Sequence, residues 1–478
     1  MNGRRLTALV LVAILTLSVV YLVEIGGKPE KHTKTKSIEP VKNVIILVGD
    51  GMGLTQVYVA DKYAQTVLGM KLMIPTIKTR GLITTYSLSS EVTDSAAAAT
   101  ALFSGYKTNN GMINVLPDGR IPNRTLGEIF KAMGKSIGIV TTTRVTHATP
   151  AGIYAHIKSR EEEAEIAEQL LKFEPTVILG GGWKYFLPKE KGGKRKDGRN
   201  LLEEFRKKGY TVVTSRDELL KLNPSKVERL IGLFSKSHMA YEVDRENIEE
   251  FKSQPSLAEM TEVALKILSK NPNGFFLMVE GGRIDHACHA HDAKAEVMDT
   301  IAFDEAVKVA LEFQKKHPDT LVIITADHET AGMSVGRGTY YEANITALKP
   351  ISCSIQYMVG EISKNPEKGA VETVLRGCGL TLTPEEEKLL FSRPLTSKIT
   401  DKELLREYPR INAYVRNWAG FVLSKIESER AKIGWTSFAH TGVPVPIYAV
   451  GPDEELFRGF YDNTEVYSKV LAAAGASS

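Results

Sequence analysis

Residues 320–328 read Thr-Leu-Val-Ile-Ile-Thr-Ala-Asp-His, an apolar run that ends in two residues able to bind a metal ion. A short run rich in β-branched residues is typical of a buried strand. In an open parallel sheet, functional side chains gather beyond the carboxyl ends of the strands, where Asp327 and His328 would lie. This stretch therefore predicts an α/β sheet with a metal site at one edge.

Short apolar runs alternate with amphipathic stretches from residue 41 onward. The expected strands cover 44–48, 81–86, 136–142, 176–179, 275–279, 321–325 and 447–450. Stretches with apolar residues at helical spacing lie between them, at 125–133, 161–171, 256–270 and 296–316. Alternation on this scale predicts an α/β fold, with a mostly parallel central sheet and helices on both faces.

The alternation breaks over residues 332–438, where the pattern predicts separate helices, including 401–405 and 410–428. We interpret this part as a region inserted like a cap or crown before the last core strand. Together with the residues around it, it would form a single catalytic domain over 43–478.

The first 42 residues differ from the rest of the chain. Arg4 and Arg5 precede an almost unbroken apolar run over 6–23, whose 18 residues are enough to cross a bilayer. We expect 1–27 to be a signal peptide or an N-terminal membrane anchor, and 28–42 to be a linker. Either interpretation predicts an exported protein, secreted or anchored at the cell surface.

The charge of the chain argues against a nucleic-acid partner. The net charge of +4 arises in the first 42 residues, and the remainder carries 54 basic and 54 acidic side chains. A neutral body lacks the basic surface that nucleic-acid binding requires. Of the three cysteines, Cys353 and Cys378 either pair, as an exported protein allows, or both stay reduced; pairing would leave Cys288 free.

Residues 285–289, Asp-His-Ala-Cys-His, form a second stretch with the character of a metal site. Asp285 and His289 are four residues apart, so on a helix they share a face and can hold one ion. Cys288 is either a ligand or a packing residue. Packing is favoured, because its position on such a helix points partly away from that face.

A glycine-rich turn, Gly49-Asp50-Gly51-Met52-Gly53, follows the first expected strand. Leu54 interrupts the G-x-G-x-x-G pattern, so a dinucleotide site is not predicted. Two interpretations remain open for this motif. The glycines let the backbone present Asp50 at the end of the strand, or the segment is a structural turn in which Asp50 caps the following helix.

Ser95 begins an alanine-rich stretch that predicts a helix. Free N–H groups and the dipole at a helix start favour an anion there. No G-x-S-x-G motif is present, so a metal ion, and not a histidine, is the expected activator of this serine as a nucleophile. The alternative is that Thr93 or Asp94 is an ordinary helix cap.

Further polar residues lie next to expected strands. His147 and Thr149 come after the strand at 136–142, Glu280 comes directly after the strand at 275–279, and His440 precedes the strand at 447–450. Arg160 suits the bidentate binding of a phosphate, although a surface pair with the acidic residues after it is the simpler alternative.

Taken in order, seven motifs closely resemble those of the alkaline phosphatase family. They are Gly49-Asp50-Gly51-Met52-Gly53, Thr93-Asp94-Ser95-Ala96-Ala97, His147-Ala148-Thr149-Pro150, Val279-Glu280-Gly281, Asp285-His286-Ala287-Cys288-His289, Thr325-Ala326-Asp327-His328 and His440-Thr441-Gly442. They span residues 43 to about 451, so the resemblance covers the whole core.

The resemblance implies hydrolysis of small phosphate monoesters with two zinc ions and a third ion, usually magnesium. The implied ligands are Asp285, His289 and His440 for the first zinc, Asp50, Asp327 and His328 for the second, and Asp50, Thr149 and Glu280 for the third ion. Ser95 would attack phosphorus and form a phosphoserine, while Arg160, oriented by Asp94, would bind the non-bridging oxygens.

His147 and His286 take places where the best-known bacterial enzyme has Asp and Lys. The resemblance puts them beside the ligands, where an imidazole would let another divalent ion replace magnesium. Family members are often dimers, which makes a homodimer the implied assembly. Two other functions stay open: a phosphodiesterase of the same superfamily, and an exported metal- or phosphate-binding protein without turnover.

Overall fold

The computed structural model describes residues 41–338, 341–409 and 411–477. The signal peptide or anchor expected at 1–27, and all but the last two residues of the linker expected at 28–42, lie outside these ranges. Among the residues that are described, no helix is both long and apolar enough to cross a membrane.

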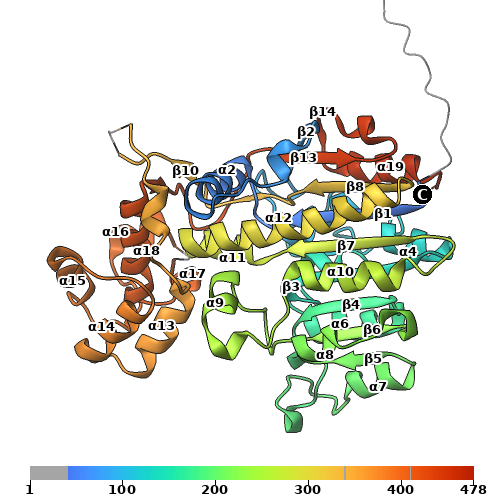
Figure 1. Cartoon of the computed structure of the whole chain (residues 1–478). Coiled ribbons are helices and arrows are strands. Elements are labelled where there is room, and N and C mark those ends of the chain that lie inside the picture. Colours follow the sequence, from blue (N-terminus) through green and yellow to red (C-terminus); the bar gives the residue numbers. More distant parts are fainter. Residues whose placement is uncertain (1–40, 339–340, 410, 478) are drawn as a thin grey trace, which may run out of the picture. The chain divides into compact units, whose positions relative to one another are not determined.

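A ten-stranded sheet runs through the described chain, in the order β14-β2-β13-β8-β1-β7-β3-β4-β6-β5 (Figure 1). Its strands are β1 Asn43–Gly49, β2 Thr79–Thr84, β3 Ser136–Arg144, β4 Val177–Gly181, β5 Thr211–Val213, β6 Leu230–Leu233, β7 Phe275–Gly281, β8 Thr320–Thr325, β13 Val445–Val450 and β14 Gly459–Asp462. Only β13 runs antiparallel to its neighbours, β2 and β8, within this sheet of the described chain. The mostly parallel sheet predicted from the sequence is confirmed.

Helices cover both faces of this sheet. Those outside the region between β8 and β13 are α2 Leu54–Tyr63, α3 Ser95–Ser104, α4 Leu126–Ala132, α5 Ala148–Ala151, α6 Glu163–Phe173, α7 Leu201–Lys207, α8 Arg216–Leu220, α9 Glu242–Asn247, α10 Leu257–Leu268, α11 Arg283–His289, α12 Ala293–Lys316 and α19 Thr464–Ala473. On β7, Phe275 contacts Phe313 of α12 with ring centroids 5.6 Å apart, and Phe276 stacks on Phe130 of α4 at 5.1 Å. Neighbouring residues of a strand point to opposite faces, so α4 and α12 cover different faces.

The central strands are buried along their whole length, as expected for a parallel sheet covered on both sides. β1 pairs with β7 up to Gly49 and Gly281, and with β8 up to Val48 and Thr325. The carboxyl ends of these three strands therefore meet at one edge. The residues that follow them are brought together there.

Between β8 and β13 the chain forms a second hydrophobic core. Its helices are α13 Ile355–Lys364, α14 Lys368–Gly377, α15 Pro384–Leu390, α16 Lys402–Glu407, α17 Ile411–Tyr414 and α18 Trp418–Ala431, and Figure 1 shows them grouped at the left of the sheet. A disulfide joins Cys353 and Cys378, whose Cα atoms are 5.2 Å apart. Cys288 is free and buried.

The structure corrects the sequence prediction in two places. The single helix expected at 410–428 is two helices, because Arg416 has a positive φ of 64° and Asn417 caps a new helix, α18. Three sheet strands, β5, β6 and β14, were not predicted. Each has only three or four residues, too few for a periodic pattern to stand out.

Candidate active site

Four carboxylates from separate segments meet at the edge formed by β1, β7 and β8. Asp50, Glu280 and Asp327 are fully buried, and Asp285 is 4% exposed. Burial and then the neighbouring carboxylates raise the pKa of Asp50, and burial raises the pKa of Asp327 to about 7. So much buried negative charge requires cations close by.

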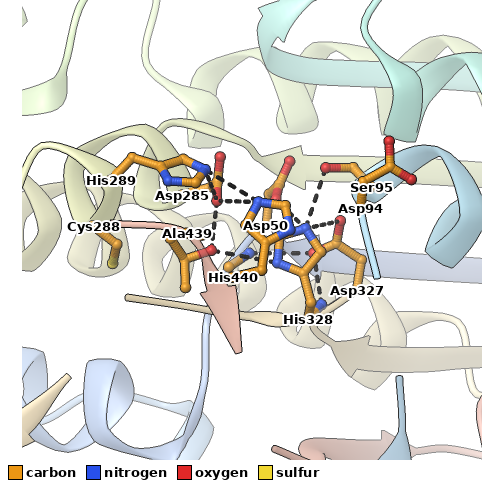
Figure 2. A network of polar contacts seen from close by, with 12 residues as sticks. Asp50, Asp94, Ser95, Asp285, Cys288, His289, Asp327, His328, Ala439 and His440 are labelled. Atoms are coloured by element: carbon orange, nitrogen blue, oxygen red, sulfur yellow. Dashed lines mark hydrogen bonds and ion pairs between the residues drawn. The ribbon is translucent and has the colours of Figure 1, made fainter. Parts of the chain in front are cut away.

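The first candidate metal group consists of Asp285, His289 and His440. Nε2 of His289 lies 3.3 Å from Asp285 Oδ1 and 3.1 Å from Nε2 of His440 (Figure 2). Each ring has Nδ1 next to a backbone carbonyl oxygen, Phe438 O at 2.6 Å and Thr93 O at 2.8 Å. With the protons on Nδ1, both Nε2 lone pairs are available to one ion.

The second group contains Asp50, Asp285 and His328. Nε2 of His328 lies 3.5 Å from Asp50 Oδ1 and 3.3 Å from Asp327 Oδ2, so Asp327 also borders this group. The rings of His328 and His440 stack with centroids 3.6 Å apart, which makes the first two groups neighbours. Nitrogen and carboxylate donors of this kind suit zinc.

The third group brings together Asp50, His147 and Glu280. Thr143 donates a hydrogen bond of 2.9 Å to Glu280 Oε2, while Glu280 Oε1 and the buried Thr149 hydroxyl have no partner. We expected His147 to lie beside the ligands. The structure places one of its ring nitrogens within 4.8 Å of both carboxylates, so it joins the candidate ligands.

Unpartnered buried atoms show that these groups fit metal ions. Buried polar atoms normally have hydrogen-bond partners. In the described part of the chain, those without one include both Asp50 oxygens, Glu280 Oε1, Asp327 Oδ2, Thr149 Oγ1 and His147 Nδ1. Asp50 therefore does not cap the following helix. The N-cap residue of α2 is Gly53, and no side chain caps this helix. The interpretation of the glycine-rich turn as a cap is wrong.

Ser95 lies at the start of α3, with Oγ 3.2 Å from His328 Nε2. Asp94 caps the helix by accepting a hydrogen bond of 3.0 Å from Ala97 N. Its other oxygen accepts one of 2.9 Å from Arg160 Nη1. Arg160 therefore pairs with Asp94 and not with the acidic residues that follow it, and the serine, the arginine and the second group lie together.

Ser95, Asp94 and Arg160 line a cleft of about 940 Å³, together with the first metal group. The chain between β8 and β13 contributes part of its wall, including Tyr414 and Arg416. The ring of Tyr414 stacks on His289, with centroids 4.2 Å apart and planes 6° apart. The cleft is much larger than a single phosphate needs.

The sequence prediction missed several residues of the cleft. His238, Arg144 and Arg283 line it, and the ring of His238 lies 4.3 Å from that of His286. His238 follows β6, a strand that was not predicted. Recognising that strand would have drawn attention to the polar residue after it.

Gln56 and Glu329 were also missed, and they lie behind the metal groups. Nε2 of Gln56 donates hydrogen bonds to Glu329 Oε1 at 2.7 Å and to Thr330 O at 3.1 Å. Glu329 further accepts from the backbone N–H groups of Gly332 at 3.0 Å and Met333 at 3.2 Å, and from the Thr441 hydroxyl. The carboxylate is buried and accepts four hydrogen bonds.

This pair joins segments that carry candidate ligands. Strand β9, Glu329–Thr330, follows His328 and pairs antiparallel with β12, His440–Thr441. Gln56 belongs to α2, which begins just after Asp50. A Cβ atom at Gly53 would lie 2.5 Å from Glu329 Cγ, so the last glycine of the turn gives the glutamate its space.

Comparisons with known proteins agree with this geometry. A family model described as alkaline phosphatase matches residues 41–476. Alkaline phosphatase 3 of Bacillus subtilis is 35% identical over 476 residues, which cover 97% of this chain and 96% of that protein. A membrane-bound alkaline phosphatase of Bombyx mori is 38% identical over 336 residues, 60% of each chain. The crystal structure of Thermus thermophilus alkaline phosphatase superposes with a TM-score of 0.82 at 33% identity, and the match covers 94% of this chain and 96% of that one.

Proposed function

Since the chain belongs to the alkaline phosphatase family and hydrolyses phosphate monoesters, we propose that Ser95 is the nucleophile of this reaction. The observation that carries the proposal is the position of Ser95 Oγ. It lies 3.2 Å from His328 Nε2, at the start of a helix and next to the pair formed by Asp94 and Arg160.

We assign the ligands of two zinc ions and a third ion from the donor atoms of the three groups. Asp285, His289 and His440 would hold the first zinc, and Asp50, Asp327 and His328 the second. The ions would lower the pKa of the serine hydroxyl and stabilise the departing oxygen as Lewis acids. Asp50, Thr149 and Glu280 offer oxygen ligands that suit magnesium, and His147 admits another divalent ion.

The protein's own groups carry the rest of the reaction. Ser95 Oγ attacks phosphorus in line, the ester bond breaks, and a phosphoserine forms. Water then attacks the phosphoserine and releases phosphate. Arg160, held by Asp94, donates hydrogen bonds to the non-bridging oxygens and offsets their charge throughout. His286 would contact the phosphate through a water molecule.

A phosphodiesterase and a binding protein without turnover are not favoured, because the relatives found are alkaline phosphatases. The proposal extends to location and assembly. The apolar run at 6–23 supports an exported protein, secreted or anchored by that segment, and the Bombyx mori relative is membrane-bound. A homodimer and an inserted cap over 332–438 also belong to the proposal.

Hydrolysis of phenyl phosphate tests this function, before and after treatment with a chelator. We expect chelation to abolish turnover, zinc and magnesium together to restore it, and Ser95→Ala to lower kcat about a thousandfold or more. Ser104→Ala, at the far end of the same helix, is the control that should retain activity. Full activity in Ser95→Ala would refute the role of this serine.

A further inference from the structure

Arg283 is a buried cation without a carboxylate partner in the cleft wall. It is 3% exposed, and no ion pair within 4.0 Å involves it among the described residues. Its guanidinium donates to His286 Nδ1 at 2.9 Å and to Gln356 Oε1 at 3.2 Å, and it lies 3.7 Å from the centre of the Tyr241 ring. Within the part of the chain that the structure describes, its Nε has no hydrogen-bond partner. The charge of Arg283 favours the ionised forms of three buried carboxyl groups, those of Asp244, Asp292 and Asp299, although none of them lies within 4.0 Å of the guanidinium. A buried N–H without an acceptor is unfavourable, so an anion that reaches Nε would be bound there.

A second unsatisfied donor lies beside it. Arg144 Nη1 donates to His238 Nε2, so a neutral His238 carries its proton on Nδ1. This Nδ1 is buried and has no acceptor among the described residues. Arg144 itself is paired, because its Nε donates to Glu163 Oε2 at 2.6 Å.

These residues form one continuous surface, which we call the Arg–His wall: Arg144, His238, Arg283 and His286. The rings of His238 and His286 are 4.3 Å apart, and they lie 5.4 and 5.8 Å from the ring of His147. His147 Nε2 in turn lies 2.9 Å from Arg160 Nη2. The wall therefore begins where the proposed phosphate site ends.

We propose that the Arg–His wall is a second anion subsite, which binds a carboxylate or phosphate group carried by the leaving group of the substrate. The proposal rests on the function proposed above. The favoured substrates are then phosphate monoesters whose leaving group carries a further anionic group. The cleft of about 940 Å³ has room for both groups, and the four side chains of the wall all carry N–H groups and include no carboxylate.

A pair of matched substrates tests the subsite. Phenyl phosphate and 3-carboxyphenyl phosphate differ by one carboxylate, and inorganic pyrophosphate supplies a phosphate in its place. For each variant we compare the ratio of kcat/KM for the anionic substrate to kcat/KM for phenyl phosphate. Arg283→Gln should lower this ratio about tenfold, because a charged hydrogen bond is lost.

Two further variants separate binding from folding and from overall charge. Arg144→Gln, at a position whose side chain is 15% exposed, should lower the same ratio, and it carries the test if Arg283→Gln does not fold. Lys184→Gln removes a charge near Arg144 at a side chain that does not line the cleft, and should change the ratio less than twofold.

The outcomes are distinct. A lower ratio for 3-carboxyphenyl phosphate, pyrophosphate or both supports the subsite and identifies which anion it accepts. Ratios within twofold of the unmodified protein in both arginine variants overturn the subsite, while the proposed function stands. If phenyl phosphate itself is not hydrolysed by the metal-loaded protein, the proposed function fails instead.

Discussion

Asp94 makes contacts in two directions, and its substitution separates helix capping from phosphate binding. One carboxylate oxygen caps α3, and the other accepts from Arg160 at 2.9 Å. In Asp94→Asn the amide oxygen retains the cap, but the amide nitrogen faces Arg160 and the charge is lost. We expect KM to rise about tenfold, with a small change in melting temperature. An unchanged KM together with a large fall in melting temperature would show that Asp94 is only a cap.

Asp304 makes the free energy of unfolding depend on pH. Burial raises the pKa of Asp304 from its ordinary value of 3.8 to about 6, even though its carboxylate accepts hydrogen bonds from Met73 N at 2.7 Å and Ile74 N at 2.8 Å. The folded protein therefore binds this proton more tightly than the unfolded chain. The contribution is present below about pH 4 and is lost as the pH rises through 6, by about 3 kcal/mol.

Unfolding of Asp304→Asn by urea between pH 4 and 7 measures this term. The free energy of unfolding of the unmodified protein, minus that of the variant, should fall across this range. A difference that stays constant with pH would mean that the carboxyl group titrates alike in both states.

At the scale of residues, the sequence predicted candidate ligands that the structure brings together, and it missed the residues packed behind them. Asp285 and His289 stand out because few residue types bind metals and their spacing fits one helix face. Glu329 stands next to His328 in the sequence, yet nothing local distinguishes a buried glutamate from an exposed one. Its partners Gln56 and Thr441 are 273 and 112 residues away, so only the folded chain shows their relation.

At the scale of elements, the pairing of β9 with β12 sets the distance between the two histidine-bearing segments. Glu329 of β9 stabilises this pairing by accepting a hydrogen bond from Thr441 of β12, and its contact with Gln56 links the pair to α2. In Glu329→Gln, an amide NH₂ replaces an oxygen that accepts hydrogen bonds, so the paired strands β9 and β12 lose contacts. We expect zinc affinity to fall about tenfold or more, because partners of metal ligands tune affinity to this degree.

Zinc transfer to a chelator, followed optically, measures this effect independently of turnover. Gln56→Glu combined with Glu329→Gln restores a donor facing an acceptor across the pair, and should recover part of the lost affinity. If the double variant releases zinc as fast as Glu329→Gln alone, the contact between the two side chains is not what holds β9 and β12 in place.

The strands show why some elements can be predicted and others cannot. β1, β7 and β8 are long, apolar and covered on both faces, so hydrophobicity alone identifies them. β5 and β14 are edge strands of three and four residues, and partly exposed positions interrupt their pattern. The break between α17 and α18 depends on a backbone angle at Arg416, a residue type that gives no warning of a positive φ.

At the scale of the whole molecule, the described chain has two main hydrophobic cores, one around the sheet and one between β8 and β13. The disulfide Cys353–Cys378 lies in the second core, and its cysteines are 25 residues apart. Closing a loop of that size lowers the entropy of the unfolded chain and stabilises by about 3 kcal/mol. Replacing both cysteines by serine should therefore destabilise this region first.

Limited proteolysis of the double serine variant locates the effect. Cleavage should appear within 345–431 at lower urea concentrations than in the unmodified protein, while the sheet stays protected. Simultaneous loss of protection in both cores would show that they unfold as one cooperative unit.

Two carboxylates are shared among the candidate metal groups: Asp285 belongs to the first and second, and Asp50 to the second and third. Ions bound there would not occupy independent sites. An ion in the second group neutralises charge on Asp285, which the first group also uses, and on Asp50, which the third group also uses. Its presence therefore alters the affinity of the first and third groups for their ions. By reciprocity, an ion in either of those groups alters the affinity of the second group. In metal titrations, the binding constant measured for one group should therefore change when a neighbouring group is already filled.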